Sequence, residues 1–522
     1  MTQPIQGSLE YWAQIKPDET AIIDENGSEL TWKEWNRQSD LLADSFVRAG
    51  LRPKDIVAVR SQIRKEWFVV NRALAKVGCM QIGLNWHFTL PEILHVMKDS
   101  GATAVVFDDP TPDVLLPLWD ELPLKTMVGI NTNPHPEVEQ YENLISEREV
   151  EARISKVVKP ELIIYTSGTT GHPKGVFKDP AKAMKQNLKV LLEYQQDMLD
   201  ASGFMKTGNI SLVNTPLHHG LGPYNAEITH KSGGTVVLLK KFDPEKTLEL
   251  IMKHKITRWT CVPTLLKRIA QLPEEVLKKY DVSSIKTLTV GAAPVPYSLK
   301  EWAMNYFGEH CVYEGYGSSE AGLVTILQPE LQRSKAGSCG YPYKHVQVEI
   351  RDENGQKLNT GEVGVIWVKT PVCIDRYLNK EKLGPDTLDE NGFFQTGDMG
   401  YLDEDGYLYI NDRIKDMIIS GGVNIYPAEI EAVLQKHPAV QDVAVIGIPD
   451  EEFGEQIKAF CEINKNVTVT EEELIEYCRS QLASYKRPRS IEFVDELPRN
   501  TVGKITKNDL RKAYWKEKER NV

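Results

Sequence analysis

Hydrophobic residues recur along the chain in two spacings, as short continuous runs and as longer periodic segments. Largely apolar runs occupy residues 56–59, 104–107, 235–239 and 287–290, and segments with helical spacing lie between them. A run of four or five such residues in this setting predicts a strand buried on both faces of a sheet. Strands that alternate with helices indicate an α/β protein built from layered helices and sheets.

One helix is predicted from its start signal. Thr31-Trp32-Lys33-Glu34 has the Ser/Thr-x-x-Glu form of a capping box, in which the hydroxyl and the carboxylate each accept a hydrogen bond from a backbone amide. The apolar spacing continues through Leu41, Leu42 and Phe46 to a glycine at Gly50. We therefore expect a helix that begins at this box and stops at the glycine.

The character of the chain changes near residue 412. A stretch punctuated by glycines ends there, and the charged segment Asp412–Asp416 that follows is typical of an exposed linker. We expect a large domain over residues 1–411, a hinge over 412–415 and a small α+β domain over 416–522.

The small domain is predicted to contain two helices and two strands. One helix begins at Pro427, and a second begins with another capping box, from Thr470 to Glu473. Apolar runs at 443–448 and near 457–463 predict the strands.

Net charge limits the kinds of partner. The chain carries 62 Lys and Arg against 74 Asp and Glu, a formal net charge of −12, whereas nucleic acids and anionic membrane surfaces attract basic proteins. We therefore expect small-molecule partners and no nucleic acid, and leave a homodimer open. The sequence has no signal peptide and no run of about 18 apolar residues that would span a membrane, so a cytoplasmic location is expected.

A loop rich in glycine and hydroxyl groups follows the apolar run at 162–164. Glycines let backbone amides wrap around an anion, hydroxyls add donors, and a lysine supplies positive charge. The loop is therefore predicted to bind a triphosphate, and the residues that contribute are Thr166, Ser167, Gly168, Thr169, Thr170, Gly171 and Lys174.

This loop does not match a Walker A motif. Lys174 lies between Pro173 and Gly175, whereas a Walker A lysine is followed by the Ser or Thr that binds magnesium. The segment after Lys174 instead predicts a returning strand, so the loop is expected to join a hairpin. A solvent-exposed turn is the alternative interpretation.

The loop resembles the phosphate-binding signature of the adenylate-forming superfamily, which includes acyl-CoA synthetases, beetle luciferases and the adenylation domains of non-ribosomal peptide synthetases. Matching segments recur in order from about Leu30 to Lys504. The resemblance implies a large N-terminal domain of layered α/β subdomains with a distorted β-barrel, and a small mobile C-terminal domain. It also implies ATP and CoA as co-substrates and Mg²⁺ as cofactor.

Two segments resemble those that hold adenine and AMP in the superfamily. By this resemblance Tyr316 would face the base, Ser319 would bond the α-phosphate in place of a more usual threonine, and Glu320 would hold magnesium together with the Thr166 hydroxyl. A hard divalent cation accepts such oxygen ligands. The residues implied in nucleotide binding are Gly291, Ala292, Ala293, Glu314, Gly315, Tyr316, Gly317, Ser318 and Ser319.

Three further positions resemble the ribose site and the hinge. Asp398 ends a segment that resembles the ribose-binding motif, and an ionised aspartate can accept from both ribose hydroxyls. Arg413 falls where the superfamily has an arginine that also bonds the ribose, and Lys415 stands at the hinge position and is included with the catalytic residues.

Lys504 is the strongest catalytic candidate. The segment Leu497–Ile505 closely matches the terminal lysine motif of the superfamily. When a carboxylate attacks the α-phosphorus two anions meet, and an ammonium placed there stabilises the transition state. The CoA thiol must later reach the same carbonyl, so the resemblance implies a rotation of the small domain that brings Ser420, Gly421 and Gly422 to a pantetheine tunnel.

Adjacent histidines mark the expected acyl pocket. Superfamily members usually have Pro-Leu/Met-aromatic-His where this chain has Pro216-Leu217-His218-His219. His219 would lie beside the acyl carboxylate and act in catalysis, while His218 replaces the aromatic residue. Two adjacent histidines without a third ligand are poor evidence for zinc. The residues expected to line the pocket are His218, His219, Val262 and Gly291.

Together these motifs predict an acid:CoA ligase. It would activate a fatty, aryl or steroid acid with ATP to acyl-AMP and pyrophosphate, and then form acyl-CoA and AMP. Two alternatives stay open: a freestanding adenylation enzyme that loads a carrier protein, and a nucleotide-binding protein without activity.

Overall fold

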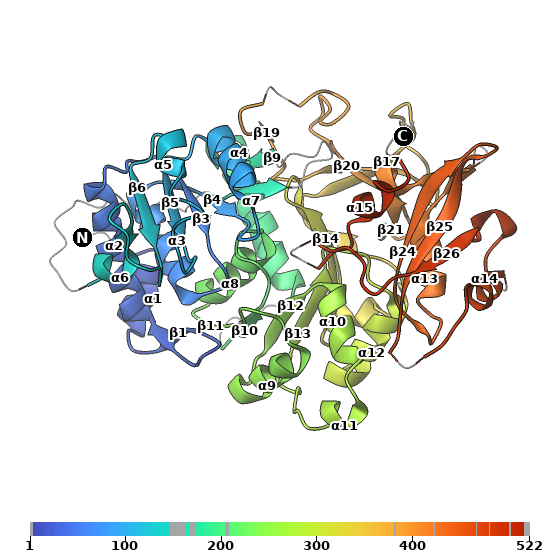
Figure 1. The fold of residues 1–522 in the computed structure, drawn as a ribbon, viewed down its shortest axis with the longest axis horizontal. Helices are drawn as coiled ribbons and strands as arrows, with labels where there is room; N and C mark the ends of the chain where they lie inside the picture. Colours follow the sequence, from blue (N-terminus) through green and yellow to red (C-terminus); the bar gives the residue numbers. More distant parts are fainter. Residues whose placement is uncertain are drawn as a thin grey trace.

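The fold was analysed in a computed structural model. The structure describes residues 4–146, 162–166, 174–178, 180–203, 208–380, 383–420, 423–465, 467–479, 481–500 and 503–515. Figure 1 shows a large body, coloured from blue through green and yellow to light orange, with a smaller dark-orange-to-red unit at one end. The fold is mixed α/β with a large N-terminal domain and a small C-terminal domain, as predicted.

Among the described residues, nine strands form the largest sheet, in the order β16-β15-β14-β13-β12-β10-β11-β1-β2. Its central pairs are parallel and its two ends antiparallel. The strands are β1 Thr20–Ile23, β2 Glu29–Thr31, β10 Ile210–Val213, β11 Thr235–Leu238, β12 Arg258–Cys261, β13 Thr287–Gly291, β14 Val312–Ser318, β15 Gly322–Leu327 and β16 Tyr341–Pro342.

A second sheet of eight strands within the described ranges has the order β19-β9-β8-β4-β3-β5-β6-β7. Its strands are β3 Ile56–Arg60, β4 Met80–Leu84, β5 Ala104–Phe107, β6 Thr126–Gly129, β7 Glu139–Gln140, β8 Leu162–Thr166, β9 Lys174–Phe177 and β19 Arg376–Tyr377. All residues of β3 and β5 are buried. The four apolar runs therefore form buried strands as expected, although the run at 235–239 contributes only its first four residues to β11.

A small antiparallel sheet completes the large domain, with the order β17-β18-β20-β21 in the described part of the chain. Its strands are β17 Gln347–Arg351, β18 Gly364–Lys369, β20 Phe394–Leu402 and β21 Leu408–Arg413. Backbone bonding between Gly340 and Leu408 joins its β21 edge to the segment that leads into β16. This antiparallel sheet is thereby linked to the end of the nine-stranded sheet, and the distorted β-barrel implied by the resemblance stays a prediction.

Helices cover the sheets of the large domain. They are α1 Leu9–Ile15, α2 Trp32–Arg48, α3 Lys65–Val77, α4 Leu90–Ser100, α5 Leu118–Glu121, α6 Tyr141–Leu144, α7 Pro180–Ala201, α8 Leu221–Lys231, α9 Pro244–His254, α10 Pro263–Ala270, α11 Glu274–Leu277 and α12 Tyr297–Phe307, with a 3-10 turn at Pro329–Leu331. At the start of α2 the Thr31 hydroxyl accepts from the Glu34 amide as predicted. The Glu34 carboxylate, however, accepts from the side chains of Arg37 and Gln38.

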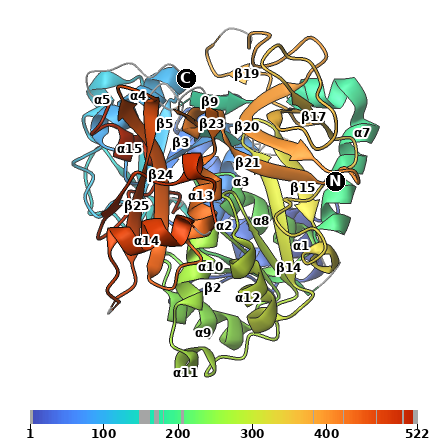
Figure 2. The ribbon, with the colours of Figure 1, turned by 90° about the vertical axis from the view of Figure 1, so that its right-hand side faces the viewer.

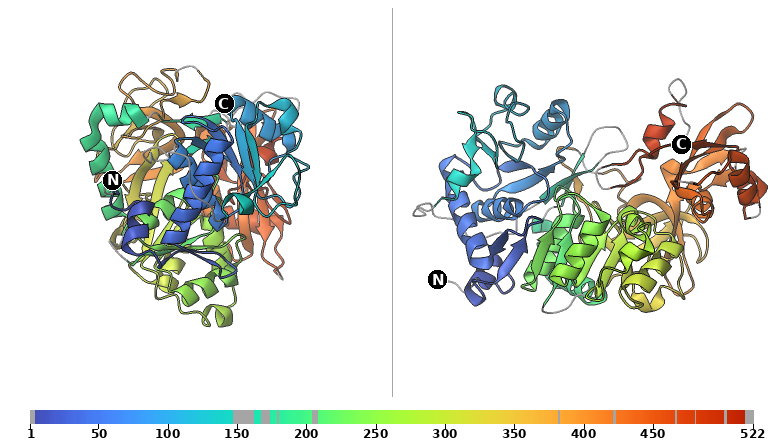
Figure 3. Two further views of the ribbon diagram at one scale, coloured as in Figure 1. Left: turned by 90° about the vertical axis from the view of Figure 1, so that its left-hand side faces the viewer. Right: turned by 60° about the horizontal axis from the view of Figure 1, so that its bottom comes forward.

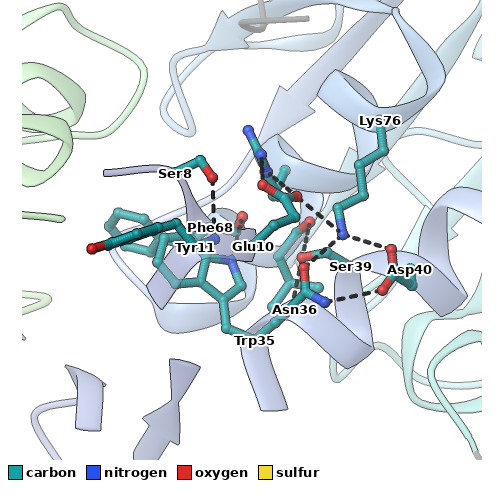
Figure 4. A network of polar contacts seen from close by, with 11 residues as sticks. Ser8, Glu10, Tyr11, Trp35, Asn36, Ser39, Asp40, Phe68 and Lys76 are labelled. Carbon is teal, nitrogen blue, oxygen red and sulfur yellow. Dashed lines mark hydrogen bonds and ion pairs between the residues drawn. The ribbon is translucent and has the colours of Figure 1, made fainter. Parts of the chain in front are cut away.

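The N-terminal helix is held by a buried polar network. Lys76 on α3 is 2% exposed and contacts Glu10 of α1 together with Asn36 and Asp40 of α2 (Figure 4). A buried ammonium is tolerated only when it is paired and hydrogen-bonded. The hydrophobic pattern of α3 did not predict that a lysine would lie inside this three-helix junction.

The small domain is an α+β unit around one sheet, β23-β22-β25-β24, with β26 beside β25. Its strands are β22 Ile418–Ser420, β23 Val423–Ile425, β24 Val440–Asp450, β25 Gly454–Ile463 and β26 Ser490–Phe493; its helices are α13 Pro427–Leu434, α14 Glu471–Arg479 and α15 Lys507–Arg511, with 3-10 turns at Ile414–Asp416 and Ser484–Lys486. Both halves of the predicted capping box at Thr470 and Glu473 are formed.

The small domain packs beside α10 and α12 of the large domain (Figures 2 and 3). Two residues of α10 contact the small domain. The Thr264 hydroxyl donates to the Gly503 carbonyl at 3.0 Å, and Lys267 forms an ion pair with Asp442 at 3.3 Å. Within the described residues, no helix is both long enough and apolar enough to cross a bilayer.

Candidate active site

The ends of β13 and β14 form the floor of the candidate site. Gly291 lies opposite Gly315 in the parallel register, and a β-carbon on Gly291 would lie 2.4 Å from the Gly315 carbonyl oxygen. Gly317 is equally close to the Gly322 carbonyl, at 2.3 Å. These glycines are therefore required for the strands to approach each other, whatever else they bind.

Ala292, directly after β13, has a left-handed backbone with φ of +63°. This conformation brings the β-carbon of an alanine close to its own carbonyl and costs about 1–2 kcal/mol. Such strain is retained where the surrounding structure holds a residue in place, and it clusters at ligand sites. The neighbouring Ala293 and the more distant Ser319 are half-buried.

Tyr316, Asp398 and Arg413 meet although they come from three strands. The Tyr316 hydroxyl donates to Asp398 Oδ2 at 2.6 Å, and Arg413 Nε lies 3.2 Å from Asp398 Oδ1. Burial and the Asp398 charge raise the pKa of Tyr316 well above its ordinary value, so the phenol stays protonated and donates. Each carboxylate oxygen can accept more than one bond, so Asp398 keeps capacity for the ribose hydroxyls.

Glu314 takes part in a buried ion pair that the sequence did not predict. Its Oε2 lies 2.6 Å from the ammonium of Lys300 on α12, and Lys300 has no exposed surface. Burial raises the pKa of Glu314, while Lys300 opposes that shift. The pair fixes β14 against α12, and no motif signals it because Lys300 is an ordinary polar position within the helix.

The segment that carries Lys504 is tied to the large domain. Besides the bond from Thr264 to Gly503, the Lys504 amide donates to Asn500 Oδ1 at 2.9 Å, which closes the turn. The predicted pocket residue Val262 is 2% exposed and lies under this turn, 3.8 Å from where a β-carbon on Gly503 would be. The lysine loop of the small domain therefore sits over the expected acyl pocket.

The charges of Arg413, Lys415, Lys504 and Asp398 act on one another at this point. Burial and the charges of Arg413 and Lys415 lower the pKa of Lys504 to about 8, and Asp398 opposes them. Burial and the charges of Arg413 and Arg511 also lower the pKa of Lys415, and Asp416 and Asp398 oppose that shift. A cluster with more positive than negative charge attracts an anion, which is what the phosphates of ATP would supply.

The two histidines lie side by side, and the charge of Lys504 acts on one of them, His219. Their ring centres are 4.4 Å apart. Burial, followed by the charge of Lys504, lowers the pKa of His219 to about 4, and burial lowers that of His218 to about 3. Both imidazoles are therefore neutral near pH 7, so His219 can offer an N–H to a carboxylate without adding charge.

The predicted hairpin is formed by β8 and β9, which pair antiparallel with Thr166 opposite Lys174. The Lys174 ammonium lies 5.5 Å from the centre of the Tyr377 ring, and the Tyr377 hydroxyl donates to Glu320 Oε1 at 3.3 Å. The base of the predicted phosphate loop and the predicted magnesium ligand are therefore neighbours.

Two further predicted residues, Ser318 and Ser420, take part in local backbone contacts. The Ser318 hydroxyl accepts a hydrogen bond from the Ala321 backbone amide, with an N to Oγ distance of 3.0 Å, and so stabilises the turn after β14. Ser420 ends β22 and pairs with Val423 and Gly454. The residues that lie outside the described part of the chain are Ser167, Gly168, Thr169, Thr170, Gly171, Gly421 and Gly422, together with the side chain of Thr166.

Lys178 is a further cation of this region that the sequence did not predict. Burial lowers the pKa of Lys178, at the end of β9, to about 8, and its charge interacts with Glu320. Its signal in the sequence was weak, since a single lysine after a strand is an ordinary surface feature.

Two sequence models cover most of the chain. That of the AMP-binding enzyme family matches residues 9–378, and that of the AMP-binding enzyme C-terminal domain matches residues 429–504. The chain belongs to the AMP-binding enzyme family. The resemblance to the adenylate-forming superfamily is thereby confirmed, and the protein is an AMP-forming ligase of the acid:CoA ligase branch.

Known family members match over almost their whole length. The fatty acid–[acyl-carrier-protein] ligase ScoC of Streptomyces coeruleorubidus is 30% identical, covering 100% of this chain and 98% of its own. The long-chain-fatty-acid–CoA ligase FadD13 of Mycobacterium tuberculosis is 31% identical over 97% of both chains. The ATP-bound structure of MatB from Rhodopseudomonas palustris superposes with a TM-score of 0.83 at 28% identity, covering 98% of this chain and 99% of that one.

Proposed function

We propose that this family member joins a carboxylic acid to AMP with release of pyrophosphate, and then transfers the acyl group to the thiol of CoA with release of AMP. The observation that carries the proposal is the position of Lys504. The preceding residue, Gly503, accepts a hydrogen bond from Thr264 of the large domain, and the charges of Arg413 and Asp398 act on Lys504. These observations support a shared site for the ribose, the phosphates and the acyl carboxylate.

In the first half-reaction a carboxylate oxygen attacks the α-phosphorus and pyrophosphate leaves. With a pKa of about 8, Lys504 is mostly an ammonium at pH 7. It would stabilise the charge that builds up on the oxygens around phosphorus, and Arg413 adds positive charge beside it. Neutral His219 would orient the attacking carboxylate by one hydrogen bond, and Asp398 and Tyr316 would hold the ribose and the base.

The residues around Glu320 fit a magnesium ion. Among the described residues no group of three or more His, Cys, Asp and Glu could hold a metal by itself. Magnesium, however, usually binds through one or two carboxylates plus substrate phosphates, and Glu320 offers such a carboxylate, with the Thr166 hydroxyl predicted as a second ligand. When bound, the ion would neutralise phosphate charge, and Lys174 would add to that effect.

The second half-reaction requires Lys504 to leave. The 412–415 segment is the proposed hinge, and β21 ends within it at Arg413. A rotation there would bring the stretch from Ser420 through Gly421 and Gly422 toward the acyl group, where it would line a tunnel for the pantetheine arm of CoA.

CoA is the proposed acceptor because FadD13 and other relatives are named CoA ligases. ScoC is named as a ligase that uses an acyl-carrier protein, so a carrier protein is the second candidate acceptor. A fatty, aryl or steroid acid is the proposed substrate, and a cytoplasmic location and a homodimer are kept as predictions.

Pyrophosphate release separates these proposals. The protein is supplied with ATP, magnesium and a panel of fatty, aryl and steroid acids, alone, with CoA or with an acyl-carrier protein. A single burst that becomes turnover only with CoA supports the ligase. Turnover that needs the carrier protein supports the carrier protein as acceptor. The absence of pyrophosphate release with every acid would refute the proposed activity.

A further inference from the structure

His218 is a buried polar side chain with unmet hydrogen-bonding capacity. It is 4% exposed, and in the described part of the structure neither Nδ1 nor Nε2 has a hydrogen-bond partner. The backbone there has no room to move toward β4, because a β-carbon on Gly83 would lie 2.6 Å from the His218 Cα. The His218 backbone therefore packs closely against β4, and both ring nitrogens are unsatisfied.

The charge state of this ring restricts what can bind it. Burial, and after it the charges of His219 and His87, lower the pKa of His218 to about 3. At neutral pH the ring then has one N–H donor and one nitrogen lone pair. A neutral group that both donates and accepts matches it, whereas a second carboxylate would be buried beside a ring that carries no compensating charge.

The His218 ring lies beside His219, the residue predicted to contact the acyl carboxylate. The His219 pKa responds to the charge of Lys504, and the His218 ring centre is 4.4 Å from that of His219. The electrostatic neighbours of His218 are His219 and His87, so His218 lies beside the histidine that the charge of Lys504 affects. If the carboxylate of the acid contacts His219, as predicted, the next part of the acyl group would come within reach of the neighbouring His218 ring.

We propose that His218 selects acids that carry a neutral group able to donate and to accept a hydrogen bond, such as a hydroxyl or amide group, on the acyl portion, in preference to plain hydrocarbon acids. The inference rests on the proposed adenylation activity and adds the substrate class to it. An acid without such a group would leave both ring nitrogens unsatisfied inside the closed site, which weakens its binding in the transition state.

Matched pairs of acids test this. Saturated straight-chain acids are compared with their hydroxylated counterparts of the same length, and cinnamic acid with 4-hydroxycinnamic acid, by kcat/KM for pyrophosphate release. We expect at least one hydroxylated acid to exceed its plain partner by about 10- to 100-fold, the range for an unsatisfied buried polar group. The dicarboxylic acid of the same length should be no better than the plain acid.

His218→Phe is expected to bring that ratio close to one, and His218→Asn to preserve part of it. His310→Phe, an exposed position between α12 and β14, is the control and should leave the ratio unchanged. The inference would be overturned if the wild-type enzyme showed no preference for the hydroxylated acids, or if the His218→Phe variant kept that preference; neither result would affect the proposed activity. If His218→Phe does not fold, the wild-type ratio and the ratio of His218→Asn decide. The absence of pyrophosphate release with every acid would overturn the proposed activity and this inference with it.

Discussion

Lys267 of the large domain and Asp442 of the small domain form an ion pair at 3.3 Å, and Arg499 holds the other oxygen of the same carboxylate at 2.6 Å. Although burial would raise the pKa of Asp442, the charges of Lys267 and Arg499 lower it. Because Lys267 neighbours Thr264 on α10, which bonds the Gly503 carbonyl, this pair stabilises the arrangement in which Lys504 reaches the site.

The first prediction concerns this pair. Lys267→Ala should slow acyl-AMP formation relative to thioester formation by about two- to fivefold, since a partly exposed ion pair contributes up to about 1 kcal/mol. Single-turnover measurements of the two half-reactions give the ratio. Lys253→Ala, at an exposed position on α9, is the matched control. Equal slowing of both half-reactions would speak against a role specific to the domain arrangement.

The second prediction concerns Lys504 itself. Lys504→Ala should lower the rate of acyl-AMP formation by roughly 10²- to 10³-fold or more, as when a transition-state donor is lost. Thioester formation from supplied acyl-AMP and CoA should change little, because the proposed rotation removes this lysine first. Lys512→Ala, an exposed lysine after α15, serves as control. If both half-reactions failed together, the rotation account would be wrong.

The third prediction is a pH dependence. Lys504 must carry its proton to stabilise the transition state, and its pKa is lowered to about 8. For acyl-AMP formation, kcat/KM should therefore be level below this pH and fall as pH rises through about 8, because kcat/KM reports the free enzyme. His219, with its pKa of about 4, adds no titration between pH 5 and 8.

The variant Lys504→Arg tests whether Lys504 causes the fall in kcat/KM near pH 8. A guanidinium stays protonated throughout this range, so whatever activity the variant keeps should show no decline near pH 8. An unchanged decline in the variant would assign the titration to another group.

The fourth prediction concerns the buried pair of Lys300 and Glu314. Lys300→Met leaves the Glu314 carboxylate buried without its partner, which should destabilise the protein by about 3–5 kcal/mol. Thermal unfolding of the variant measures this. The double variant Lys300→Met with Glu314→Gln removes the charge as well and should recover most of the loss. No recovery would show that packing of the lysine stem, rather than its charge, was responsible.

Local sequence information was sufficient for much of the fold. The runs at 56–59 and 104–107 form buried strands, and the Thr470 capping box forms completely, because these features depend on neighbours within a few residues. The box at Thr31 forms only by half, since Glu34 is engaged by Arg37 and Gln38 on the next turn. The strand predicted near residue 457 begins earlier, at Gly454, because pairing with β24 extends it.

The motifs of the sequence identified the family and named the groups that chemistry on ATP requires, but only the tertiary structure decided which of them meet. Tyr316 and Asp398 are 82 residues apart and share a hydrogen bond, and the Lys300 partner of Glu314 carries no motif at all. Sequence spacing encodes contacts along one helix or strand. Contacts between sheets and domains depend on strand order and on how the small domain docks, so the unsatisfied nitrogens of His218 and the approach of Lys504 became visible only in three dimensions.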